Sequence, residues 1–67
     1  MTVAKVSEIT STSAKSFDDA IDRGIRRATK TLKNVTNAWI ADQEVEVDKG
    51  KVTIYRVRMR VTFVLED

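Results

Sequence analysis

Neither cysteine nor histidine occurs in this chain of 67 residues. Disulfide bonds are therefore excluded, together with metal sites built from thiolates or imidazoles. The commonest general base and the most reactive nucleophile of enzymes are missing as well, so we do not expect catalysis. Proline is also absent and 42% of the residues are hydrophobic, a composition typical of a folded protein rather than a disordered segment.

No hydrophobic run approaches the roughly 20 residues that a membrane-spanning helix needs. The first residues lack the apolar core of a signal peptide, so we expect a cytoplasmic protein without a membrane partner. Twelve Lys and Arg residues against ten Asp and Glu give a net charge of +2, far from the basic footprint of a nucleic-acid-binding protein. Residues 1–67 are expected to form one small domain, and domains of this size usually need association, metals or disulfides for stability.

The first half of the chain predicts a strand followed by a helix. Residues 3–10 are rich in β-branched side chains and favour a strand, which the small hydroxyl residues 11–13 are expected to end. From residue 17 to about residue 34, hydrophobic side chains recur every three or four positions, which is typical of a helix with one apolar face. Ser16 is the expected N-cap, with Asp19 approximating the second half of a capping box.

The second half predicts a β-hairpin. Acidic residues alternate with valines up to Asp48, and arginines alternate with hydrophobic residues from Tyr55 onward. We interpret residues 48–50 as a three-residue loop with Gly50 in the left-handed conformation. This loop sets a register that brings hydrophobic side chains together on one face: Val47 with Lys51, Gln43 with Tyr55, and Asp42 with Arg56. The predicted fold class is α+β, with the order β-α-β-β and a three-stranded antiparallel sheet around one helix.

The predicted last strand is longer than the helix that would cover it. About 15 residues of strand span about 50 Å, whereas the helix covers only about 27 Å. An uncovered sheet with open edges is prone to aggregation unless it pairs with something specific. We therefore expect identical chains to assemble with one another.

Trp39 is the only tryptophan and lies at the predicted start of the second strand. It serves either as a core or subunit-interface anchor or as a flat platform for a planar ligand. Arg56, Arg58 and Arg60 form a cationic row on the last strand. They either pair with acidic residues of the second strand or bind phosphate or RNA. Because the acidic strand next to them would repel a polyanion, we favour pairing for Arg58 and Arg60 and expect no nucleic-acid partner.

Several segments resemble the dodecins: residues 12–17 (TSAKSF) before the helix, residues 30–35 (KTLKNV) at its end, and residues 55–66 (YRVRMRVTFVLE) in the last strand. The resemblance extends over essentially all 67 residues. It implies a hollow homododecamer of dodecin type, in which flavins bind noncovalently between subunits and are stored and protected from photochemistry without turnover.

Flavin-binding dodecins place a stacking Trp at the start of the second strand and a Gln in the last strand. The matching positions here are Asn37 and Arg56, with Trp39 two residues after the first. The resemblance implies that Trp39 stacks on riboflavin or FMN, Arg56 meets the polar edge of the ring, and Asn37 and Asp42 line the pocket. Strict alternation points Trp39 and Arg56 to opposite faces of one chain. Either a β-bulge between Trp39 and Val45 re-aims the tryptophan, or the two side chains meet across a subunit boundary.

A second interpretation concerns the carboxylates of the second strand. Glu44, Glu46 and Asp48 share one face of that strand, where they form a solvated edge or a cluster of oxygen ligands for a hard cation. The alternative function is thus a dodecin-like shell without flavin binding, whose Glu44 and Glu46 bind Ca²⁺ or other cations. Coenzyme A is a further candidate ligand.

Overall fold

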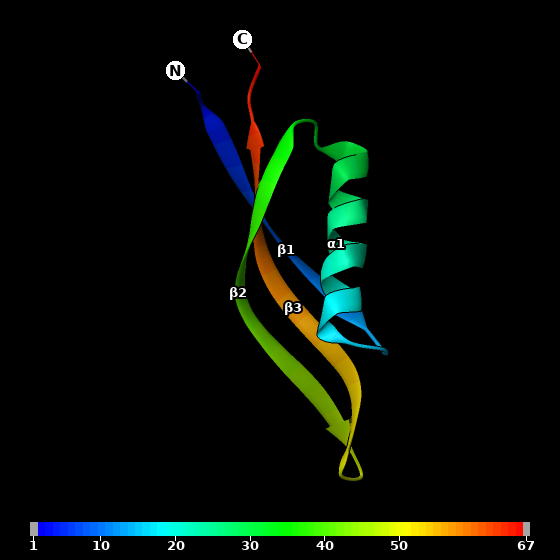
Figure 1. Ribbon diagram of the computed structural model, residues 1–67. Helices are drawn as coiled ribbons and strands as arrows, with labels where there is room; N and C mark the ends of the chain where they lie inside the picture. Colours follow the sequence, from blue (N-terminus) through cyan, green and yellow to red (C-terminus); the bar gives the residue numbers. More distant parts are fainter. Residues whose placement is uncertain (1, 67) are drawn as a thin grey trace.

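Three strands and one helix make up the computed structural model, which describes residues 2–66. Strand β1 (Ala4–Ser13) leads to helix α1 (Phe17–Thr31), and strands β2 (Val35–Asp48) and β3 (Lys51–Val64) form a hairpin. All neighbouring strands are antiparallel, and β3 occupies the centre of the order β1-β3-β2. The predicted α+β class and the β-α-β-β order are confirmed, and Figure 1 shows the sheet curving past one side of α1.

Strand β1 continues through Ser13, beyond its predicted end at residue 10. The hydroxyl residues do not end it, because β3 supplies partners as far as Tyr55, which lies opposite Ser13. The buried Ser13 hydroxyl then closes the turn into the helix. It accepts a hydrogen bond from the backbone N–H of Lys15 at 2.9 Å and donates one to Oδ2 of Asp19 at 2.5 Å. Strand pairing thus outweighs the local preference of these residues.

Ser16 is the N-cap of α1, as predicted, and its Oγ accepts a hydrogen bond from the backbone N–H of Asp19 at 3.0 Å. The carboxylate of Asp19 does not complete the predicted capping box but binds the Ser13 hydroxyl and Nε of Arg23. The helix ends at Thr31, earlier than predicted, because Leu32 is already extended and Asn34 has a φ of 62°. Within residues 2–66, no helix is long and apolar enough to cross a membrane.

The hydrophobic core lies between α1 and the sheet face that contacts it, which we term the inner face. Val57, Met59 and Val61 of β3 are completely buried there, together with Ala20 of the helix. Gly24 permits this close packing, since a Cβ atom at its position would lie 2.8 Å from Cε of Met59 and 3.0 Å from Cβ of Ser11. The opposite side of the sheet, the outer face, carries no helix.

The hairpin turn is one residue shorter than predicted. Lys49 and Gly50 have φ values of 51° and 78° and form a two-residue turn, the geometry that matches the twist of a hairpin. The predicted register is therefore wrong, and the observed pairs are Val47 with Val52, Gln43 with Val57, and Asp42 with Arg58. Beyond the turn, a register shift between Glu46 and Val47 leaves Thr53 without a residue opposite it. This shift restores the hydrophobic inner face that the shorter turn alone would have inverted.

A second register shift re-aims Trp39. Asp42 pairs with Arg58 and Ile40 pairs with Met59, so Ala41 has no residue opposite it on β3. Trp39 consequently pairs with Arg60, which shares its face with Arg58 because the two are separated by two residues. Of the two alternatives left open by the sequence, the structure contains the β-bulge, and Trp39 lies on the outer face.

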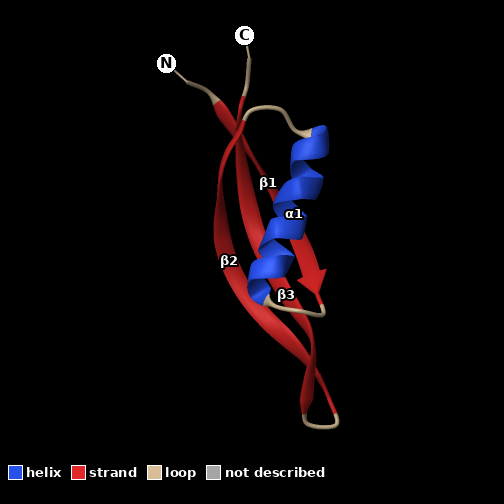
Figure 2. Ribbon diagram, turned by 45° about the vertical axis from the view of Figure 1, so that its right-hand side comes forward, coloured by secondary structure: helices blue, strands red, loops and turns tan. Residues whose placement is uncertain are grey.

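The β2–β3 ribbon projects beyond the N-terminal end of α1, as Figure 2 shows. The molecule measures 52 × 19 × 13 Å, so its longest dimension is set by this ribbon. Val45, Val47 and Val52 lie in the projecting part and are 39%, 60% and 47% exposed. The predicted overhang is confirmed, and it leaves hydrophobic side chains without cover in the single chain.

Candidate functional site

The outer face gathers most of the residues singled out from the sequence. The sheet brings together an exposed indole, three arginines and several carboxylates from all three strands: Glu8, Trp39, Asp42, Glu44, Glu46, Arg56, Arg58 and Arg60. Regular alternation places the charged residues of β3 opposite its buried ones. The face therefore offers charge and one aromatic ring, while the inner face supplies the core.

Trp39 is 57% exposed, so it is not a core residue of the single chain. Cζ of Arg60 lies 4.8 Å from the centroid of the Trp39 ring, within the range of a cation–π contact. Nε of Arg60 in turn donates to Oε2 of Glu8 at 3.3 Å. Because Glu8 and Trp39 both pair with Arg60 across the sheet, the three side chains form one row that crosses β1, β3 and β2.

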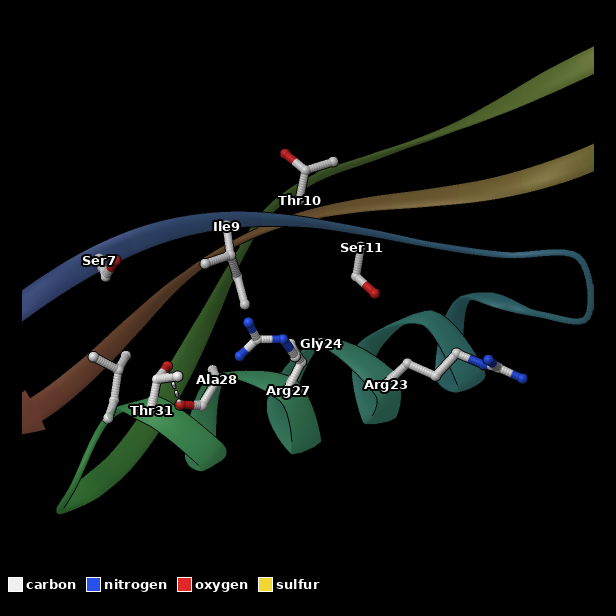
Figure 3. Close-up of a pocket in the computed structure, with 10 residues that line it drawn as sticks. Ser7, Ile9, Thr10, Ser11, Arg23, Gly24, Arg27, Ala28 and Thr31 are labelled. Carbon is white, nitrogen blue, oxygen red and sulfur yellow. Dashed lines mark hydrogen bonds between the residues drawn. The ribbon is translucent and has the colours of Figure 1, made fainter.

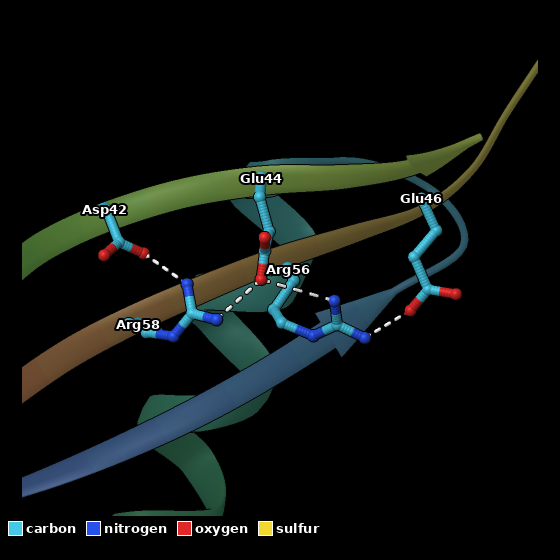
Figure 4. Close-up of polar contacts among 5 residues, drawn as sticks. All are labelled: Asp42, Glu44, Glu46, Arg56 and Arg58. Carbon is cyan, nitrogen blue, oxygen red and sulfur yellow. Dashed lines mark hydrogen bonds and ion pairs between the residues drawn. The ribbon is translucent and has the colours of Figure 1, made fainter.

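Arg56 and Arg58 form a ladder of ion pairs with β2, shown in Figure 4. Arg58 donates to Asp42 and to Glu44, each at 2.7 Å, and Arg56 donates to Glu44 at 3.4 Å and to Glu46. The bond to Glu46 raises the pKa of Arg56 above its ordinary value, and the bonds to Asp42 and then Glu44 raise the pKa of Arg58. The predicted pairing with acidic residues of the second strand is confirmed for Arg58 and is wrong for Arg60, which binds Glu8 of β1.

Of the predicted flavin-site residues, Arg56 is separated from Trp39 within a single chain. Arg56 lies four residues from Arg60 along β3, a separation of about 13 Å, and its guanidinium is engaged by two carboxylates. The arginine that contacts Trp39 is Arg60, for which no role beside the tryptophan was predicted from the sequence. Only recognition of the bulge at Ala41 would have revealed this contact.

Asn37 and Asp42 flank Trp39 on the outer face, because the three residues pair with Thr62, Arg58 and Arg60, alternate residues of β3. Asn37 pairs with Thr62 and stands two residues from Trp39, and its Oδ1 accepts a hydrogen bond from Oγ1 of Thr36 at 2.9 Å. Asp42 lies on the other side of the bulge and is bound to Arg58. Asn37 and Asp42 are thus each one row of the outer face away from Trp39.

Three carboxylates of β2, those of Asp42, Glu44 and Glu46, form ion pairs with arginines. Among residues 2–66, no group of three or more His, Cys, Asp or Glu side chains is arranged to hold a metal ion. Glu44 and Glu46, the residues of the cation interpretation, both bind Arg56. A cation at either glutamate would have to compete with a guanidinium that the strand pairing already places there.

A cleft of about 400 Å³ opens on the inner side, between β1 and α1. Its floor includes Ile9, Ala28 and Leu32, and Arg23 and Arg27 contribute its polar rim. Figure 3 shows the guanidinium of Arg27 between the helix and β1, whereas Arg23 extends along the helix toward the β1–α1 turn. None of the predicted site residues lines this cleft, because they lie on the outer face of the sheet.

The chain belongs to the dodecin family, because residues 3–66 match the family model described as Dodecin. The calcium dodecin of Mycobacterium tuberculosis is 34% identical over 64 residues, which cover 94% of this chain and 89% of that protein. Its solved structure, described as a calcium-chelating antigen with a novel calcium-binding site, has a TM-score of 0.83 at 31% identity and covers 96% of this chain and 91% of that one. The resemblance drawn from the sequence is confirmed.

Solved structures of other dodecins agree with the fold even more closely. The dodecin from Streptomyces davaonensis has a TM-score of 0.93 at 30% identity, covering 98% of this chain and 97% of that one. An Arg-to-Ala variant of the Thermus thermophilus dodecin has a TM-score of 0.94 at 28% identity and covers both chains completely. The β-α-β-β arrangement is thus shared along the whole length of the protein.

Proposed function

We propose that this dodecin binds a flavin, riboflavin or FMN, noncovalently on its outer sheet face, and stores and protects it without catalytic turnover. The observation that carries the proposal is the exposure of Trp39, whose side chain is 57% accessible although it is the only tryptophan of the chain. The proposed setting is a cytoplasmic homododecamer in which the flavin lies between subunits.

An exposed indole on a strand is well suited to stacking. Its apolar ring surface is large, it has only two side-chain torsions to fix, and the strand pairing with Arg60 holds its backbone in place. A flavin ring stacked on it would remove both aromatic surfaces from water. Electron transfer from the indole then quenches the excited flavin, which is the physical basis of photoprotection.

The remaining proposed site residues act from a neighbouring subunit or from beside the ring. Asn37, two residues from Trp39 on β2, offers an amide with both donor and acceptor groups. Arg56 and Asp42 are bound into the ion-pair ladder. We propose that Arg56, which is separated from Trp39 within one chain, approaches a flavin held by the Trp39 of another copy, and that Asp42 lines the pocket beside its own Trp39.

Assembly is supported by surface that the single chain leaves uncovered. β1 and β2 are both edge strands, and the projecting ribbon exposes Val45, Val47 and Val52. Unpaired edges and clustered exposed apolar side chains favour association. The number of twelve copies is proposed from membership of the family.

The proposal is tested by adding the purified protein to riboflavin and to FMN and recording flavin fluorescence. We expect emission to fall at micromolar protein concentration, and to be restored in a Trp39→Ala variant that keeps the oligomeric mass of the wild type. Trp39→Phe is the matched control, because it retains a stacking ring but is a poorer electron donor, so it should bind with weaker quenching. Undiminished emission with the wild-type protein would refute flavin binding.

A second candidate function is binding of Ca²⁺ through Glu44 and Glu46, which is favoured by the calcium dodecin that is 34% identical to this chain. Both glutamates would have to exchange a guanidinium for the cation or share it with another copy. Calorimetric titration with CaCl₂ separates the two functions. A heat of binding that the wild type shows and the Glu44→Gln and Glu46→Gln variants lose would support calcium binding at these residues. The absence of a heat of binding in the wild type would exclude it.

A further inference from the structure

We propose that Arg60 makes the Trp39 site selective for flavins that carry a phosphate group, so that FMN is bound in preference to riboflavin. This inference rests on the proposed function, because it names the ligand class of the same site. It starts from the contact between the Arg60 guanidinium and the Trp39 ring, at 4.8 Å, which places a cation against the platform that a flavin would use.

Arg60 differs from the other two arginines of the outer face in its hydrogen bonding. Arg56 and Arg58 each bind two carboxylates through their terminal nitrogens. Arg60 binds only Glu8, through Nε and at a longer distance of 3.3 Å. Its two Nη groups have no hydrogen-bond partner within the part of the chain that the structure describes, residues 2–66. The fork of the guanidinium is therefore available to a ligand.

The row of Glu8, Arg60 and Trp39 is also easily rearranged. The Arg60 and Glu8 side chains are 50% and 58% exposed, so water screens their ion pair. Exposed cation–π contacts are similarly weak. A ligand that offers the guanidinium a better partner can draw it away from the indole without disturbing the core, since none of the three side chains is buried.

The chemistry of the two flavins then decides between them. A ring stacking on the face that Arg60 covers displaces the guanidinium, and riboflavin, being neutral, gives it no charged partner in exchange. The phosphate of FMN presents oxygens that match the planar fork of arginine and form charge-assisted hydrogen bonds. Bonds of this kind correspond to a difference of about 10- to 100-fold in affinity.

The test uses the emission of Trp39, which is specific to this site because the chain has no other tryptophan. The full-length protein is titrated with FMN and with riboflavin. We expect FMN to bind about 10- to 100-fold more tightly. Arg60→Met should abolish this preference, because it should weaken the binding of FMN while riboflavin binds at least as tightly as it does to the wild type. Arg58→Met is the matched control, since it removes an arginine two residues away on the same face and should keep the preference.

Two further measurements address the phosphate itself. Inorganic phosphate should compete with FMN but not with riboflavin, because it occupies the guanidinium and not the ring. Glu8→Gln should strengthen FMN binding, because it frees Arg60 and removes a negative charge close to the phosphate. These effects should shrink at high salt, as expected for partly exposed charges.

The outcomes separate this inference from the function on which it rests. Equal affinities of the wild type for the two flavins, or loss of the preference in Arg58→Met as well as in Arg60→Met, would overturn the role of Arg60 while flavin binding stands. If neither flavin changes the emission of Trp39, both the flavin function and the selectivity are refuted.

Discussion

The side chains on the two faces of the sheet are held by different interactions, and the central strand β3 shows this most clearly. Val57, Met59 and Val61 point inward and are completely buried, while Arg56, Arg58 and Arg60 alternate with them on the outer face. Inner side chains are held by close packing that includes the glycine contact at Gly24. Outer side chains are held by ion pairs that water reaches. Neighbouring residues of one strand should therefore respond very differently to substitution.

Met59→Ala should be the most damaging change. Met59 is completely buried at the centre of the core, and truncating a buried side chain of this size costs about 2–5 kcal/mol of unfolding free energy. Urea denaturation of the variant and of the wild type, followed by circular dichroism, measures the loss. Val45→Ala, on the uncovered ribbon, is the control and should lose much less. Equal losses would mean that the ribbon is buried as deeply as the core.

Gly24→Val should have the second-largest effect, a loss of about 1–3 kcal/mol in unfolding free energy, which is the usual cost of overpacking. Its side chain would enter the space held by Met59 and Ser11. Gly24→Ala should lie closer to the wild type, because the better helix propensity of alanine, about 1 kcal/mol, offsets the smaller clash. Thermal unfolding measures both. A valine variant as stable as the alanine variant would show that the helix can move away from the sheet freely.

Asp19→Asn tests the polar end of the inner face through its pH dependence. The hydrogen bond from Ser13, followed by the bond from Arg23, lowers the pKa of the Asp19 carboxyl below its usual value. A lowered pKa in the folded state stabilises the protein above the ordinary value of about 4 and ceases to do so as pH falls through the lowered value. The variant should thus melt below the wild type at pH 7, and the difference should shrink as the pH falls below about 4.

The control for that experiment is Asp18→Asn, an exposed neighbour in the same first turn of α1. It removes the same charge from the helix N-terminus without touching Ser13. A melting curve for Asp18→Asn that repeats the pH dependence of Asp19→Asn would show that the helix dipole, and not the Ser13 bond, is responsible.

Arg58→Met should have the smallest effect on stability, although it removes two hydrogen bonds of 2.7 Å. Its partners are exposed, and water replaces the guanidinium around them. We expect a slight decrease in melting temperature that vanishes when the salt concentration is raised. A loss of stability as large as that of Met59→Ala would contradict the conclusion that ion pairs of the outer face contribute much less than packing of the inner face.

The fold was predictable because its periodicities are strong. The helical stripe begins at Phe17 and the strands alternate regularly near the chain end, and both patterns identify their elements correctly. Boundaries and register were harder. The turn at Lys49 and Gly50 is shorter than predicted, and a bulge at Thr53 compensates for it. Together the two changes shift the register by two residues, which keeps every side chain on its predicted face, so the hydrophobic pattern could not reveal either.

The candidate site was predictable only in part. Trp39 is conspicuous as the single tryptophan, but its neighbour depends on the bulge at Ala41. The run from Ala38 to Ala41 contains small and large apolar residues in either phase, so no residue type marks the bulge. The assignment of Arg56 to the same pocket came from family resemblance, and within one chain Arg60 takes that place beside the ring.

The unpaired position at Ala41 has a consequence for how such proteins diverge. Removing Ala41 would leave Ile40 opposite Met59 and Trp39 opposite Arg60, whereas pairing Ala41 in regular alternation would turn the indole toward the helix and Ile40 into water. Two related chains can therefore agree at nearly every position and still present unlike surfaces, if this residue is bulged out of the ladder in one and paired in the other. In a sheet this small, the way in which the residues of two strands are paired determines the exposed surface as much as the identity of those residues does.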